Sequence, residues 1–107
     1  MVSEITCHEL YAMMNEKRSM IILDVREKWE RDICMLDSTY HIPLSQIIVR
    51  IAEIPLDIPL LIIICHHGVR SIHAGLILEK HGFKDILSLR GGIDMWSLEI
   101  EHKMKRY

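Results

Sequence analysis

The residues best suited to chemistry form one short stretch: Cys65, His66, His67, Gly68, Val69, Arg70 and Ser71. This stretch follows the most apolar run of the chain, residues 60–65, and precedes a segment with helical periodicity. The free backbone N–H groups at a helix N-terminus stabilise a nearby anion, and Arg70 adds a full positive charge. We therefore expect Cys65 to ionise readily near neutral pH and to act as a nucleophile.

Two further residues of the stretch fit a loop that wraps around one atom. Gly68 can adopt positive φ without strain, which a loop with inward-pointing amides requires. Ser71 suits the N-cap of the following helix. In the simpler interpretation, Cys65 merely closes a hydrophobic strand and an ordinary strand-to-helix turn follows. The combination of nucleophile, turn residue, cation and cap favours a reactive site.

The elements that must position this loop alternate along the chain. A capping box of Thr6 and Glu9 begins a helix. Continuous apolar runs predict strands at 20–25, 60–65 and 86–89, with a shorter one at 40–42. The segments between and after them have a helix-like pattern and predict helices at 27–33, 44–54, 71–81 and 92–98. This alternation predicts an α/β fold, a single domain over residues 1–107 with a mainly parallel central sheet and helices on both faces. Ligands of such folds collect at the carboxyl ends of the strands.

Asp24 and Arg26 end the first long strand. If that strand is a parallel neighbour of the strand before Cys65, the pair lies at the same sheet edge as Cys65. An ion pair in that position either braces the loop or serves the substrate, and we favour bracing.

Composition excludes several classes of function. The 107 residues carry 13 Lys+Arg against 15 Asp+Glu and a formal net charge of −2, so there is no basic patch to attract nucleic acid or an anionic membrane. The longest uncharged apolar run, 58–65, is far short of the ~20 residues of a membrane-spanning helix. The N-terminal sequence lacks the pattern of a secretory signal, so we expect a cytoplasmic protein.

The three cysteines, Cys7, Cys34 and Cys65, form no C-x-x-C pair, so we expect reduced thiols. Cys34 is either a resolving thiol or a packing residue, and packing is the commoner case. His66, His67 and His73 accompany Cys65, but their spacing matches no usual zinc pattern. We expect no metal and no cofactor. His66 and His67 lie either at the mouth of the site or on the surface as polar residues.

Four ordered motifs resemble those of the rhodanese homology domain, a family of single-domain sulfurtransferases. They are residues 23–26 (LDVR), 41–44 (HIPL), 65–71 (CHHGVRS) and 91–96 (GGIDMW). The resemblance implies a persulfide mechanism, in which Cys65 takes a sulfur atom from a donor and passes it to a nucleophilic acceptor. It also implies that residues 66–70 cradle the sulfur through backbone amides and that Arg70 favours an anionic donor. The implied donor is thiosulfate or a persulfide, including one carried by a protein, and the acceptor is a thiol or a cyanide-like nucleophile.

Two alternatives belong to other classes. A catalytically idle rhodanese fold would serve as a binding or thiol-sensing module, although such a member is expected to lose the nucleophile. Phosphatases of related architecture place an arginine after five intervening residues, in a loop sized for phosphate. Here only four residues separate Cys65 from Arg70, so the shorter loop favours sulfur transfer.

Overall fold

The protein is built around one parallel sheet. The computed structural model describes residues 2–107, and the strands of that region pair in the order β1-β5-β4-β2-β3. The strands are β1 (Ser3–Ile5), β2 (Ile21–Asp24), β3 (Tyr40–His41), β4 (Leu61–Ile64) and β5 (Ile86–Leu89). All four pairings are parallel, so the carboxyl ends of β2, β4 and β5 meet at one edge of the sheet.

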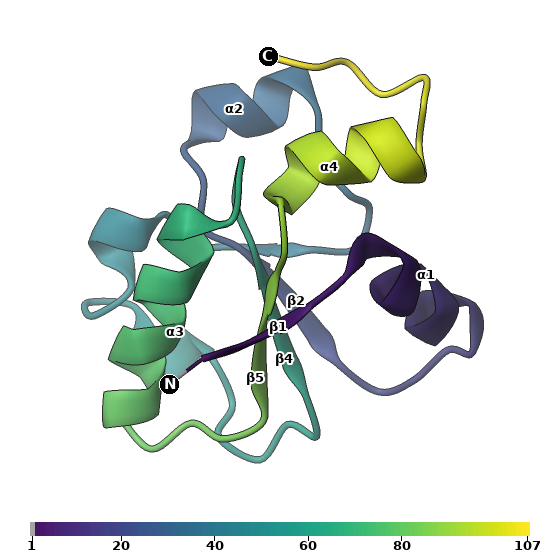
Figure 1. Cartoon of the computed structure of the whole chain (residues 1–107). Coiled ribbons are helices and arrows are strands. Elements are labelled where there is room, and N and C mark those ends of the chain that lie inside the picture. The colour runs from purple at the N-terminus through teal and green to yellow at the C-terminus, as the bar shows by residue number, and fades with distance from the viewer. Residues whose placement is uncertain (1) are drawn as a thin grey trace.

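Helices cover both faces of the sheet, which confirms the predicted fold class. The α-helices are α1 (Cys7–Asn15), α2 (Lys28–Ile33), α3 (Val69–Lys80) and α4 (Gly92–Glu99). Figure 1 shows α3 on one face and α1 with α4 on the other, while α2 lies beyond the carboxyl ends of the strands. None of the helices within residues 2–107 has the length and apolar content of a membrane span.

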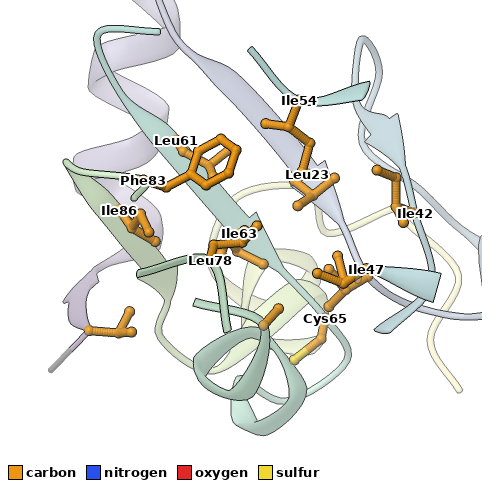
Figure 2. Close-up of a cluster of buried hydrophobic side chains, with 13 residues drawn as sticks. Leu23, Ile42, Ile47, Ile54, Leu61, Ile63, Cys65, Leu78, Phe83 and Ile86 are labelled. Atoms are coloured by element: carbon orange, nitrogen blue, oxygen red, sulfur yellow. The ribbon is translucent and has the colours of Figure 1, made fainter. Parts of the chain in front are cut away.

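Strand β4 divides the hydrophobic core into two halves. Leu61, Ile63 and Cys65 belong to the cluster under α3, and Ile62 and Ile64 belong to the cluster under α1 and α4. Successive side chains of a strand point to opposite faces, which explains this alternation. All four residues of β4 are fully buried, as expected for a strand covered on both sides. Figure 2 shows Cys65 beside Ile63 and Ile47 at the end of this cluster.

The segment 44–54 differs from the predicted helix. It forms two short 3₁₀ helices, Leu44–Gln46 and Ile51–Glu53, joined by a turn. Ile48 and Val49 are 61% and 87% exposed, so the apolar run does not present one continuous stripe to the core. Consecutive β-branched residues also disfavour a regular helix, because their χ1 freedom is lost against the preceding turn.

Candidate active site

The loop between β4 and α3 turns sharply at Gly68. As predicted, Gly68 adopts positive φ (+100°), and a Cβ there would lie only 3.2 Å from the backbone N of Gly91. Gly68 is also the N-cap of α3, so the prediction that Ser71 is the N-cap is wrong. Ser71 instead lies in the first turn of α3, where its N–H is still free of intrahelical bonding.

The Cys65 sulfur is surrounded by donors from this loop. The backbone N–H groups of Gly68 and Ser71 donate to Cys65 Sγ, at N···S distances of 3.0 and 3.4 Å. Ser71 Oγ lies 3.4 Å from the sulfur and 2.6 Å from Ser88 Oγ on β5. Cys65 is only 1% exposed. Backbone N–H groups that converge on one atom form a small concavity of hydrogen-bond donors, and Cys65 Sγ lies in it.

Helix α4 holds the same loop from the other side. The N–H of Ile93 donates to the Cys65 carbonyl (2.8 Å), and the N–H of Asp94 donates to the His66 carbonyl (3.1 Å). Gly92 has φ +62°, and a Cβ there would overlap the carbonyl groups of Cys65 and His66. The backbone of the loop therefore depends on the first turn of α4.

Arg70 is paired with Glu30 of α2. Its two terminal nitrogens donate to the two carboxylate oxygens of Glu30, each at 2.7 Å. Burial raises the pKa of Glu30, but hydrogen bonds from Arg70, the Glu27 N–H and the Tyr107 hydroxyl outweigh it and hold the pKa at about 2. Glu30 therefore balances the positive charge that Arg70 brings to the loop.

Asp24 and Arg26 lie at the expected sheet edge, since Asp24 is in register with Ile64 of the neighbouring β4. Both side chains are fully buried, and Arg26 donates to both carboxylate oxygens of Asp24. Arg26 also donates to the carbonyls of Glu30 (3.4 Å) and Cys34 (2.9 Å). This burial favours the bracing role over contact with a substrate, because the pair joins the end of β2 to α2.

Aromatic rings line the outer side of the loop. The His66 ring stacks on the Tyr107 ring, with centroids 3.7 Å apart, and its other neighbour is His67 at 3.8 Å. Burial, and then the nearby His67, lower the pKa of His66 below its ordinary value. The Tyr107 hydroxyl donates to Glu30 (2.8 Å) and accepts from Arg26 (3.0 Å). Tyr107 thus links His66 to both buried ion pairs.

Sequence reasoning missed three residues of this region: Glu30, Ser88 and Tyr107. Glu30 forms a capping box with Glu27 at the start of α2, a local pattern that reveals the helix but not the pairing with Arg70. Ser88 interrupts an apolar strand, which is a weak signal of a buried polar contact. No local pattern marks Tyr107, because its partners are distant in sequence.

Cys7 differs from Cys65 in its surroundings. Burial, and then the Glu99 charge, raise the pKa of Cys7 to about 11, so only about one Cys7 side chain in ten thousand is a thiolate near pH 7. We expect iodoacetamide to alkylate Cys65 at least about ten times faster than Cys7 in the native protein. Peptide mass spectrometry of a time course measures both rates, and the urea-unfolded protein, in which the rates converge, is the control. Faster native alkylation of Cys7 would contradict the donor cradle around Cys65.

Comparison with known proteins identifies the family. The model of the rhodanese-like domain matches residues 6–99, and the chain belongs to this family. The chain is 35% identical over 107 residues to the probable adenylyltransferase/sulfurtransferase MoeZ of Mycobacterium tuberculosis, a match that covers 98% of this chain but spans only 27% of that relative. It is 32% identical to a sulfurtransferase of Allochromatium vinosum, with 91% and 90% of the two chains covered. These relatives support a sulfurtransferase family and a rhodanese-type transferase.

Solved structures agree with this assignment. A rhodanese-related protein from Thermoplasma volcanium superposes with a TM-score of 0.82 at 28% identity, covering 92% of this chain and 93% of that one. An NAD-dependent persulfide reductase from A. fulgidus gives a TM-score of 0.70 at 33% identity, covering 89% of this chain but only 16% of that one. The fold around Cys65 is therefore shared with both stand-alone chains and parts of larger enzymes.

Proposed function

We propose that this protein is a sulfurtransferase that carries sulfane sulfur as a persulfide on Cys65. The donor is thiosulfate or a persulfide, including one carried by a protein, and the acceptor is a thiol or cyanide. The observation that carries the proposal is the set of N–H donors from Gly68 and Ser71 around Cys65 Sγ. A thiolate held in this way is both an attacking nucleophile and, later, a good leaving group.

The reaction has two balanced displacements. The Cys65 thiolate attacks the outer sulfur of the donor, a new S–S bond forms, and the donor's own S–S bond breaks with its electron pair leaving as sulfite or a thiolate. The acceptor then attacks the terminal sulfur of the Cys65 persulfide and regenerates the thiolate. With cyanide as the acceptor, the product is thiocyanate. The transferred sulfur atom thus moves from the donor to Cys65 and then from Cys65 to the acceptor. Neither step uses a cofactor.

The names of similar proteins support this reading. The Allochromatium relative is named a sulfurtransferase, and one matched structure belongs to a persulfide reductase. The cysteines at positions 7, 34 and 65 are all free, which fits a reducing compartment, and we propose the cytoplasm.

The test is direct sulfur loading. The protein is incubated with thiosulfate or cysteine persulfide, freed of small molecules and weighed intact; we expect a gain of one sulfur atom, released as thiocyanate by cyanide. Cys65→Ala should lose both signals completely, while Cys34→Ala, a matched substitution at a half-buried cysteine, should keep them. If a folded wild type gains no sulfur from either donor, the proposal fails and the idle binding or thiol-sensing module replaces it.

A further inference from the structure

Arg70 and Arg26, beside the Cys65 loop, are each paired with a carboxylate. Arg70 forms two 2.7 Å hydrogen bonds with Glu30, and its side chain is 33% exposed while that of Glu30 is 4% exposed. Arg26 is fully buried against Asp24. An anionic ligand at the loop would therefore find no unpaired guanidinium among these residues.

The Glu30 carboxylate is fixed from several sides. Besides Arg70, the backbone N–H of Glu27 donates to Oε2 (2.8 Å) and the Tyr107 hydroxyl donates to Oε1 (2.8 Å). Releasing Arg70 toward a ligand would leave this buried carboxylate without its charged partner, which is unfavourable. The pairing is thus a fixed property of the site and not a surface contact that a ligand easily replaces.

The remaining charged groups near the mouth follow the same pattern. Arg31 contacts Asp24 (3.2 Å), which it shares with Arg26, and Arg106 pairs with Asp94 (3.0 Å). Asp94 also faces the ring of His67 at 4.0 Å. Within residues 2–107, the arginines of α2, α3 and the segment beside α4 are therefore bound to carboxylates.

Apolar side chains flank the Arg70–Glu30 pair. Val69, next to Arg70, is 64% exposed, and Trp29, next to Glu30, is 60% exposed. The Trp29 ring contacts the Tyr107 ring (centroids 5.8 Å apart), which stacks on His66 of the loop, and an exposed apolar group there suits the organic part of a donor better than the oxygens of an inorganic anion.

We propose that Glu30 is a specificity-determining residue, which neutralises Arg70 and so makes the Cys65 site select thiol persulfides, R–S–SH, over thiosulfate. The proposal rests on the proposed sulfurtransferase function. The loading step is Cys65–S⁻ + R–S–SH → Cys65–S–SH + R–S⁻, in which one S–S bond forms, one breaks, and the electron pair leaves on the donor's inner sulfur. Thiosulfate brings two negative charges to the thiolate, and its leaving group is sulfite. Its reaction therefore depends on a free cation far more than the reaction of a thiol persulfide does.

The experiment measures single-turnover loading of Cys65 by intact mass with two probes, thiosulfate and cysteine persulfide. In Glu30→Gln the carboxylate charge is removed and Arg70 is freed, so the ratio of thiosulfate to persulfide rate constants should rise about tenfold. Glu53→Gln is the matched control, because Glu53 forms a similar two-point pair with Arg50 (2.8 and 3.0 Å) outside the site. Its ratio should equal that of wild type.

A second measurement needs no variant. Loading of the wild type by thiosulfate should not fall between about 0.01 and 1 M salt, because no unpaired cation attracts the dianion and salt screens only its repulsion by the thiolate. A steep fall with salt in the wild type, or an unchanged donor ratio in a folded Glu30→Gln, overturns the proposal. Absence of loading by both donors in the wild type contradicts the proposed function itself. If Glu30→Gln does not fold, the salt dependence of the wild type decides.

Discussion

Replacing Gly92 by alanine is expected to destabilise the protein by about 3 kcal/mol. The cost has two sources: alanine disfavours the left-handed backbone conformation of this position, and the added Cβ overlaps neighbouring atoms. Gly92 has φ +62°, and its Cβ would overlap the carbonyl groups of Cys65 and His66. These carbonyls accept hydrogen bonds from Ile93 and Asp94, so relief of the overlap must break that anchor. Urea unfolding measures the stability, and sulfur loading of Cys65 should fall at least about tenfold, because the loop shifts.

Gly82→Ala separates the two contributions to this effect. Gly82 also has a positive φ, +93°, but apart from its two chain neighbours no described residue lies within 4 Å of an added Cβ. The variant should lose only about 1 kcal/mol, the cost of the left-handed conformation, and keep its loading rate. Equal losses in the two variants would show that contact with the Cys65 loop contributes nothing at Gly92.

Asp24→Asn is expected to cost about 3–5 kcal/mol, because it leaves the buried guanidinium of Arg26 without a counter-charge. Asp24 and Arg26 have 0% exposed side chains, and the carboxylate also accepts from Arg31 at 3.2 Å. An amide keeps the shape of the side chain but removes the negative charge. Thermal and urea unfolding should both show the loss.

Asp32→Asn is the control for this substitution. Asp32 pairs with Lys28 at 3.2 Å on the surface of α2, with side chains 64% and 83% exposed. Exposed pairs contribute about 0.3–0.5 kcal/mol, so this variant should remain close to wild type. A loss at Asp24 as small as that at Asp32 would contradict the bracing role of the buried pair.

The strand that ends at Cys65 and the loop that follows it could be predicted because their signals are local. The β-branched run before Cys65 predicts β4, and the residues after it predict both the turn at Gly68 and helix α3. Relatives of known name and fold agree with the resulting rhodanese assignment. Local apolar pattern, turn chemistry and helical periodicity all act over a few residues, so one sequence is enough to read them.

The environment of the nucleophile could not be predicted because its partners are distant in sequence. Arg70 and Glu30 are 40 positions apart, and Tyr107 is 77 positions from Glu30. Strand β1 was also missed, since it is three residues long with one buried side chain and depends on pairing with β5. Such contacts follow from the tertiary fold, which overrides local propensity.

Because side chains alternate along β4, the number of residues in the strand decides which face of the sheet the Cys65 sulfur lies on. Cys65 shares a face with Leu61 and Ile63, toward α3 and its amide donors. Deleting one residue from β4 while its ladder with β2 and β5 is kept would turn the thiol toward α1 and α4, where Ile62 and Ile64 pack. The strand therefore tolerates exchange of one apolar residue for another far better than any change in its length.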